Sequence, residues 1–293
     1  MRTILTTALF IAFAVPISAQ DFNRGVDAYR SGDYVAAMNE WRPLAEQGNM
    51  VAQYALGVMY DLGEGVAKDS KEAIKWYSLA AEQGYALAQY NLGIIYEIGE
   101  GVSQDSKEAL KWYRQAAAQD YALAQYALGV MYDLGEGITQ DSTEAVKWYR
   151  QSAEQGYALA QYALGVIYEK GEGATNDYKQ AVQRYKQAAK QGYAIAQYAL
   201  GVMYENGLGV LQDNALAHMW YNLSAANGND LGGQNRNEIA NKMTSEEIFT
   251  AKAMARKCMN SDYKDCGEWM ENKFFQQTFS LLKLGSKAFS QTI

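Results

Sequence analysis

Hydrophobic positions along this chain follow a helical spacing inside a longer repeat. The triplet Ala-Gln-Tyr begins at residues 52, 88, 124, 160 and 196, at a constant interval of 36 residues. Segments 52–87 and 124–159 are identical at 28 of 36 positions, which identifies them as copies of one unit. An incomplete copy runs from Phe22 to Val51. A period of this size is typical of helical repeat arrays.

Each unit is predicted to begin with an amphipathic helix over about residues 52–62. Its apolar residues are spaced i, i+4, i+7 and i+8, so they share one side of a helix; they are Ala52, Leu56, Met59 and Tyr60. Gly63 is expected to end the helix, because glycine enters the left-handed region without a Cβ penalty.

A second helix is predicted to start at a capping box, with Asp69 as N-cap and Glu72 three residues later. The same pair recurs at residues 105/108 and 141/144. The apolar side of this helix is expected to comprise Ala73, Trp76, Tyr77, Ala80 and Ala81, and Gly84 is expected to end it.

One helix pair cannot bury its own apolar stripe, but stacked copies can. The sequence therefore predicts an all-α protein, an α/α solenoid whose first helices line a concave surface. The expected organisation is a partial repeat at 20–51 and five full repeats at 52–87, 88–123, 124–159, 160–195 and 196–229.

The repeated unit resembles the Sel1-like repeats, which are similar to tetratricopeptide repeats. The matching residues in the first full copy are Ala52, Leu56, Gly57, Tyr60, Gly63, Gly65, Val66, Asp69, Ala73, Trp76, Tyr77, Ala80, Ala81 and Gly84. Some copies depart from the pattern: Asp120 replaces the glycine that ends the second helix, and Arg184 stands at the position of Trp76. The resemblance implies a right-handed superhelical adaptor that mediates protein–protein contacts and is often exported from bacteria.

Residues 1–19 have the three-part pattern of a secretory signal peptide. Arg2 precedes an apolar run from Ile4 to Val15, and Ala19 is a small residue before the expected cut. The apolar run is short for a membrane span, although an uncleaved N-terminal anchor is the alternative. We expect a periplasmic or secreted protein with no transmembrane helix after cleavage.

The repeat period is lost after residue 229. Residues 230–266 are predicted to form capping helices, one of which starts at a capping box in Thr244-Ser245-Glu246-Glu247. Residues 267–293 are predicted to form an amphipathic helix and tail. That segment either caps the array or docks on a partner or a membrane surface.

Cys258 and Cys266 are the two cysteines of the chain. In an oxidising compartment they are expected to form one disulfide, worth about 2–3 kcal/mol by loop-entropy arguments; two free thiols are the alternative.

Composition and charge exclude several function classes. The chain has 26 Lys and Arg against 33 Asp and Glu, a net charge of −7, or −8 once Arg2 is removed with a leader (25 against 33). An acidic protein is a poor candidate for binding a nucleic-acid backbone. One histidine and two cysteines leave too few soft ligands for a zinc site, so we predict neither metal nor cofactor.

No residues form a convincing catalytic set. His218 is expected to be a packed or surface residue, because no nucleophile has a fixed relation to it. The pairs Ser261/Lys264 and Ser280/Lys283 match an Ser-x-x-Lys pattern, but no Ser-Asp-Asn or Lys-Thr-Gly accompanies them. We predict a protein that is not an enzyme.

The most informative surface residues lie on the first helices. Each first helix presents a tyrosine and, seven residues later, a carboxylate on the same face. These candidate partner-binding residues are Tyr54, Asp61, Tyr90, Glu97, Tyr126, Asp133, Tyr162, Glu169, Tyr198 and Glu205. The hypothesis is that they line a groove for a segment that carries Lys or Arg. The alternative is that the tyrosines pack between repeats and the acids are solvated.

The function predicted from the sequence is a monomeric, exported scaffold that binds a protein or peptide partner. The resemblance also suggests an alternative, a β-lactam-binding or weakly hydrolysing cell-wall protein. The related proteins with that activity carry a disulfide inside each repeat, however, and the repeats of this chain contain no cysteine.

Overall fold

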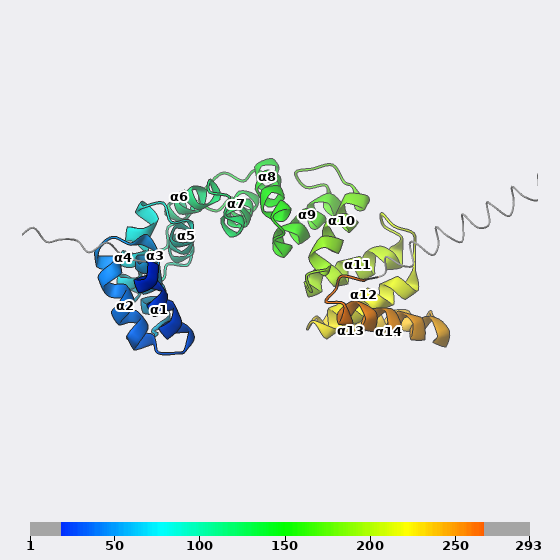
Figure 1. The fold of residues 1–293 in the computed structure, drawn as a ribbon. Helices are drawn as coiled ribbons and strands as arrows, with labels where there is room; N and C mark the ends of the chain where they lie inside the picture. Colours follow the sequence, from blue (N-terminus) through cyan, green and yellow to red (C-terminus); the bar gives the residue numbers. More distant parts are fainter. Residues whose placement is uncertain (1–18, 267–293) are drawn as a thin grey trace, which may run out of the picture. The chain divides into compact units, whose positions relative to one another are not determined.

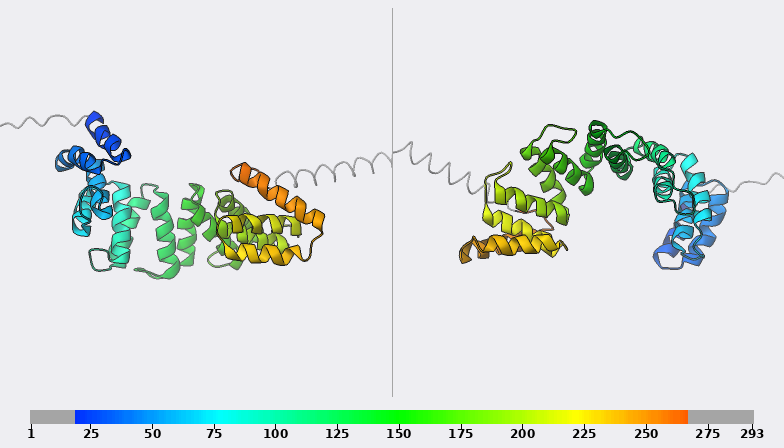
Figure 2. Two further views of the ribbon diagram at one scale, coloured as in Figure 1. Left: turned by 90° about the horizontal axis from the view of Figure 1, so that it is seen from below. Right: turned by 180° about the vertical axis from the view of Figure 1, so that it is seen from behind.

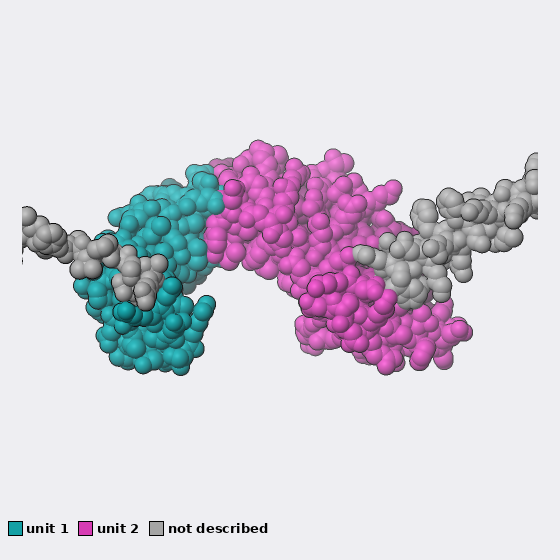
Figure 3. Space-filling model, viewed as in Figure 1, with its two compact units in different colours: residues 1–119 teal, residues 120–293 magenta. Residues whose placement is uncertain are grey.

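The computed structural model describes residues 19–266, which form fourteen α-helices and no strand (Figure 1). The chain divides into two compact units, residues 1–119 and 120–293 (Figure 3). The all-α architecture predicted from the sequence is confirmed.

Unit 1 contains a partial repeat followed by two helical hairpins. Its helices are α1 (Ala19–Arg30), α2 (Tyr34–Glu46), α3 (Met50–Leu62), α4 (Ser70–Glu82), α5 (Ala86–Ile98) and α6 (Ser106–Ala117). Within this unit, successive helices pack against each other from α1 to α6. This pattern of nearest-neighbour packing defines a solenoid of stacked helical repeats.

Unit 2 continues the hairpins and ends in two further helices. Its helices are α7 (Ala122–Leu134), α8 (Ser142–Glu154), α9 (Ala158–Lys170), α10 (Tyr178–Ala189), α11 (Ala194–Asn206), α12 (Asn214–Ala226), α13 (Asp230–Ala240) and α14 (Ser245–Asn260). The helices from α7 to α13 pack in sequence order, as in unit 1.

The two helices of a hairpin approach closely because a glycine faces an aromatic ring. A Cβ added at Gly57 of α3 would lie 2.5 Å from Cδ1 of Tyr77 in α4. The other four full repeats show the same close contact, in the pairs Gly93–Tyr113, Gly129–Tyr149, Gly165–Tyr185 and Gly201–Tyr221. Only glycine leaves room for the ring at this position.

The helix starts confirm one part of the capping prediction and correct another. Asp69 is the N-cap of α4, and its carboxylate accepts hydrogen bonds from the backbone N–H groups of Lys71 and Glu72, at 2.9 and 3.2 Å. The Glu72 carboxylate does not complete a capping box, because the Asp69 backbone N–H donates to the Tyr60 carbonyl at 2.9 Å. The Glu72 carboxylate pairs instead with the Lys75 ammonium, 3.1 Å away. Glu108 with Lys111 and Glu144 with Lys147 repeat this ion pair. The reciprocal capping box is present at α14, between Thr244 and Glu247, as predicted.

The C-terminal end of unit 2 departs from the hairpin pattern. Helix α14, orange in Figure 2, packs mainly against α12 rather than against its sequence neighbour α13. The disulfide between Cys258 and Cys266 is present, as predicted, and both cysteines are buried. The Tyr263 hydroxyl donates to Asn227 Oδ1 at 2.9 Å, which ties the disulfide loop to the end of α12.

Two of the segments predicted from the sequence lie outside the described residues. They are the apolar leader, apart from its last residue Ala19, and the amphipathic segment 267–293. Within residues 19–266, no helix combines the length and the apolar character that a membrane crossing requires.

Candidate functional site

The tyrosines of the first helices pack against aromatic rings of neighbouring helices. In unit 1 the Tyr54 ring lies 5.7 Å from the ring of Tyr77 on α4 and 5.2 Å from Tyr85, the residue that precedes α5. Tyr90 of α5 lies 5.7 Å from Tyr113 of α6. The tyrosines on the first helices are half-buried, and the second-helix rings beneath them are buried. Each half-exposed first-helix tyrosine therefore packs on a buried tyrosine ring that holds it in place.

Unit 2 repeats this arrangement. Tyr126 lies 5.6 Å from Tyr149 and 5.2 Å from Tyr157, and the next two first helices form the equivalent contacts. Those contacts are Tyr162 with Tyr185 and Tyr193, and Tyr198 with Tyr221.

The carboxylates at the ends of the first helices accept hydrogen bonds from the same buried tyrosines. The Tyr113 hydroxyl donates to Glu97 Oε2 at 2.5 Å in unit 1. In unit 2, Tyr185 donates to Glu169 at 2.5 Å and Tyr221 to Glu205 at 2.8 Å. A tyrosine and a carboxylate of one first helix thus share a partner ring on the second helix. We call these sets the tyrosine–carboxylate columns.

The two aspartates of the columns bind less tightly than the glutamates. The Tyr77 hydroxyl is 3.4 Å from Asp61 Oδ2, and the Tyr149 hydroxyl is 3.5 Å from Asp133 Oδ2. Aspartate is one methylene shorter, so its carboxylate does not reach the hydroxyl at the 2.7–2.8 Å typical of a strong O–H···O bond. Asp61 and Asp133 therefore leave more of their hydrogen-bonding capacity for other donors.

Burial keeps the column hydroxyls protonated. Desolvation raises the pKa of Tyr113 and Tyr185 far above the usual value for tyrosine, and the neighbouring glutamates raise it further. The hydroxyls of Tyr113 and Tyr185 therefore remain protonated hydrogen-bond donors at neutral pH.

The structure brings together features of both sequence hypotheses. The tyrosines do pack between helices and between repeats, as the structural alternative held. The acids, however, are not simply solvated, because each has a hydroxyl partner inside the chain. The role of Tyr54, Tyr90, Tyr126, Tyr162, Tyr198 and their acids in binding a partner stays a prediction.

Sequence reasoning missed a row of buried glutamines. The Gln53 side chain donates to the Ala45 carbonyl of the preceding repeat at 3.0 Å, and its Oε1 accepts from Gln83 at 2.7 Å. Gln161 and Gln197 make the same contact to the preceding second helix in unit 2. The signal was in the sequence, since a polar residue recurs beside Ala52 on the apolar side of every copy.

The single histidine is packed, as expected. His218 lies in α12 and is only 2% exposed, and its Nδ1 has no hydrogen-bond partner among the described residues. Burial, together with the positive charges of Arg236 and Lys252, lowers its pKa to about 4.

The serine of the first Ser-x-x-Lys match has a structural role. The Ser261 hydroxyl donates to the Cys258 carbonyl at 2.8 Å and accepts from the Asp265 N–H at 2.9 Å, inside the disulfide loop. Ser280 of the second match lies outside the described residues.

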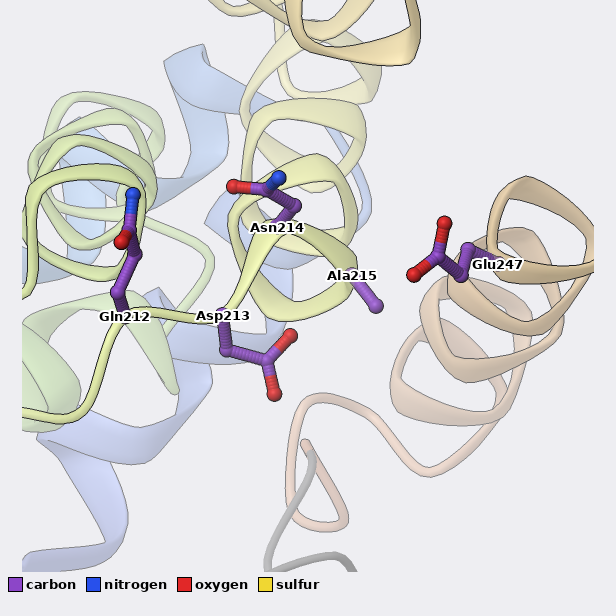
Figure 4. Close-up of a pocket in the computed structure, with 5 residues that line it drawn as sticks. All are labelled: Gln212, Asp213, Asn214, Ala215 and Glu247. Atoms are coloured by element: carbon purple, nitrogen blue, oxygen red, sulfur yellow. The ribbon is translucent and has the colours of Figure 1, made fainter. Parts of the chain in front are cut away.

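A shallow, open pocket lies between the start of α12 and the start of α14 (Figure 4). It is lined by Gln212, Asp213, Asn214, Ala215 and Glu247. Both of its acids cap helices: Asp213 accepts from the Leu216 N–H at 2.9 Å, and Glu247 accepts from the Thr244 N–H at 2.7 Å. Within residues 19–266, no group of three or more His, Cys, Asp and Glu side chains is placed to hold a metal ion.

Consecutive helical hairpins that bury their apolar faces on one another define an α/α repeat protein of the solenoid class. Comparison with known families gives the particular repeat: the chain belongs to the Sel1 repeat family. The family model matches five times, at residues 51–85, 86–121, 122–157, 158–193 and 194–229. Proteins built from Sel1 repeats generally mediate protein–protein interactions and are typically non-catalytic scaffolds.

Solved structures of similar proteins show the same fold. A Sel1 repeat protein from Oxalobacter formigenes is 38% identical, with a TM-score of 0.70, over 76% of this chain and 88% of that one. A protective antigen present in uropathogenic Escherichia coli strains is 28% identical, with a TM-score of 0.55, over 86% of this chain and 63% of that one.

One sequence relative carries a functional name. An exopolysaccharide production negative regulator of Rhizobium meliloti is 42% identical over 57 residues, which is 20% of this chain and 21% of that protein. The match thus spans about a fifth of that protein, a length of about one and a half repeats.

Proposed function

We propose that this protein is an exported, non-enzymatic scaffold that binds a segment of a partner protein along its first-helix surface. The observation that carries the proposal is the set of tyrosine–carboxylate columns, in which each half-exposed tyrosine rests on a buried ring. Tyrosine supplies a large contact area and a hydrogen-bonding tip at low entropic cost. A surface already fixed by its own chain loses little further freedom on binding.

The charge of the columns favours a partner segment with Lys or Arg. Each column ends in a carboxylate at the C-terminus of a first helix, where the helix dipole adds partial negative charge. Asp61 and Asp133 are the best placed to accept from a partner, because their own tyrosine hydroxyls lie 3.4 and 3.5 Å away. Several weak contacts at the same position of successive repeats would add up along the array.

The test removes these two charges and compares the result with a matched control. The variant Asp61→Lys/Asp133→Lys is immobilised and used to capture partners from a periplasmic extract, beside the unchanged protein. The control variant is Glu82→Lys/Glu154→Lys, which reverses two exposed acids at the ends of second helices in the same units.

The proposal predicts that the first variant loses a partner which the unchanged protein and the control variant both retain. Mass spectrometry of the eluates identifies and quantifies that partner. Equal capture by all three proteins would contradict binding at the columns.

Export is proposed on the leader-like pattern of residues 1–19, and it has its own test. Expression of the full chain in a bacterium, followed by fractionation and intact-mass measurement, should give a periplasmic or secreted protein that begins near residue 20. A cytoplasmic protein of full mass would contradict it.

A further inference from the structure

Large aliphatic side chains are exposed at one position of successive repeats. Leu62 ends α3 and is 60% exposed, and Ile98 ends α5 and is also 60% exposed. In unit 2, Leu134 ends α7 and is 61% exposed. Single exposed aliphatic residues are ordinary on a protein surface. Their recurrence at one position of three consecutive repeats is not expected from chance scatter.

The fold does not require an apolar residue at this position. The equivalent residues are Lys170 at the end of α9 and Asn206 at the end of α11. All five helices end at a glycine in the left-handed conformation, with φ values between 67° and 79°. The polar copies therefore adopt the same helix end, and the aliphatic side chains have no packing role to explain them.

Carboxylates flank each of the exposed aliphatic residues in unit 1. Asp61 and Glu64 lie on either side of Leu62 in sequence, and Glu97 and Glu100 lie on either side of Ile98. We call these six residues the apolar–acidic edge. The Lys68 ammonium pairs with this edge, 2.7 Å from Glu100 Oε1.

The carboxylates of the edge are held in place by their own chain. The Tyr29 hydroxyl donates to Glu64 at 2.5 Å, and the Tyr113 hydroxyl donates to Glu97 at 2.5 Å. Its hydrogen bond to Glu64 raises the pKa of Tyr29 to about 12, so this donor stays protonated. Each such bond occupies one lone pair of a carboxylate, which can accept about four hydrogen bonds. The remaining positions are available to cations from outside.

We propose that the apolar–acidic edge of unit 1 binds a partner segment in which aliphatic and basic side chains alternate. The aliphatic side chains would cover Leu62 and Ile98, and the Lys or Arg side chains would pair with the flanking carboxylates. This inference rests on the proposed function and specifies the chemistry of its partner. The four carboxylates of the edge disfavour an acidic segment, and two aliphatic side chains are too few to hold a purely apolar one.

The experiment uses the full chain and a defined probe. The probe is a fluorescein-labelled peptide of 14 residues in which leucine and lysine alternate. Fluorescence anisotropy gives its Kd at two salt concentrations. We expect the variant Leu62→Ser/Ile98→Ser to bind about tenfold more weakly at both salt concentrations, because two aliphatic contacts are lost. Both residues are exposed, so the variant should keep its fold, as circular dichroism will verify.

Two further variants test the carboxylates of the edge and whether an added aliphatic residue increases binding. Glu64→Gln/Glu100→Gln keeps the hydrogen-bond acceptors but removes two charges, so it should weaken binding at low salt and flatten the salt dependence. Lys170→Leu places an aliphatic residue between Glu169 and Glu172 and removes a 4.0 Å contact between Lys170 and Glu172. It should create a further binding position and increase the amount of peptide bound.

Three outcomes would overturn the proposal: no binding of the peptide by the unchanged protein, an unchanged Kd in Leu62→Ser/Ile98→Ser, or equal binding of a glutamate–leucine peptide. Its failure is distinguishable from failure of the proposed function. If the periplasmic partner is lost from the Asp61→Lys/Asp133→Lys variant but retained by Leu62→Ser/Ile98→Ser, the columns bind it and the edge does not.

Discussion

At the residue scale, small differences in side-chain length decide which polar atoms of the columns are satisfied. Glu97 reaches the hydroxyl of Tyr113 at 2.5 Å, whereas Asp133 stays 3.5 Å from the hydroxyl of Tyr149. Both pairs occupy equivalent positions of the repeat, so the extra methylene of glutamate accounts for the shorter distance.

Exchanging the two acids should therefore change stability in opposite directions. Asp133→Glu should raise the free energy of unfolding by about 0.5–1.5 kcal/mol, because it completes a hydrogen bond to a buried hydroxyl. Glu97→Asp should lower it by a similar amount. Urea unfolding of both variants measures this, and a shift of the same sign in both would contradict the assignment.

The helical glycines provide a second test at this scale. Gly129→Ala should destabilise the protein by about 1–3 kcal/mol, because the added Cβ would lie 2.5 Å from the Tyr149 ring. Gly233→Ala in α13 is the matched control, since its Cβ would meet only the Ala225 Cβ, at 3.7 Å. Alanine favours a helix by about 1 kcal/mol over glycine, so the control should be neutral or stabilising. Thermal unfolding of both variants decides the matter; a stabilised Gly129→Ala would refute the close packing.

His218 predicts a pH dependence with a definite sign. Its pKa is lowered from 6.5 to about 4 in the folded protein, so the unfolded chain binds more protons between these values. Stability from this group is therefore complete above about pH 6.5 and is lost as the pH falls toward 4. It is the single histidine of the chain, so its imidazole proton resonance reports the pKa directly. A measured pKa near 6.5 would contradict its burial.

At the element scale, the start of each second helix depends on one aspartate. Asp105 accepts from two backbone N–H groups at the start of α6, whereas Glu108 pairs with Lys111 on the helix surface. Asp105→Ala should cost about 1 kcal/mol. Glu108→Ala should be close to neutral, because an exposed ion pair contributes only a few tenths of a kcal/mol. Chemical unfolding compares the two, and equal losses would indicate a reciprocal capping box after all.

The same elements show how far sequence reasoning extends. Local rules predicted the buried positions of α3, its glycine end and the Asp69 cap, because periodicity and capping depend on neighbouring residues. They did not predict that the Asp69 backbone N–H donates to the Tyr60 carbonyl, which leaves the Glu72 carboxylate to pair with Lys75. The packing of α14 against α12 could not be predicted, because the repeat period that sets the packing order ends before α14.

The candidate site was predicted in its residues but not in its contacts. The spacing placed Tyr54 and Asp61 on one face of a helix. That the acids also bind tyrosines of the second helix depends on the approach of the two helices at Gly57, which spacing alone does not give. The burial of Gln53 was missed because the sequence does not show its hydrogen-bond partner, the Ala45 carbonyl of the preceding repeat.

At the scale of the whole molecule, the account assigns different tasks to the two helices of each repeat. The second helices supply the buried aromatic rings on which the first-helix tyrosines pack. The first helices present tyrosines, carboxylates and exposed aliphatic side chains. Stability of such an array is a sum over neighbouring repeats, while binding is a sum over equivalent surface positions. The chain can therefore vary its surface from copy to copy, as Ile98 and Lys170 show, without changing the fold.

The most direct test of this division of tasks between the two helices is to map which side chains of the protein the captured partner covers. Hydroxyl-radical labelling, read by mass spectrometry, compares side-chain reactivity in the free and bound protein. We expect protection of Tyr54, Tyr126 and Leu62 on the first helices, while Leu79 on the second helix α4 stays as reactive as before. Protection confined to Leu79 and the second helices would contradict a first-helix binding surface.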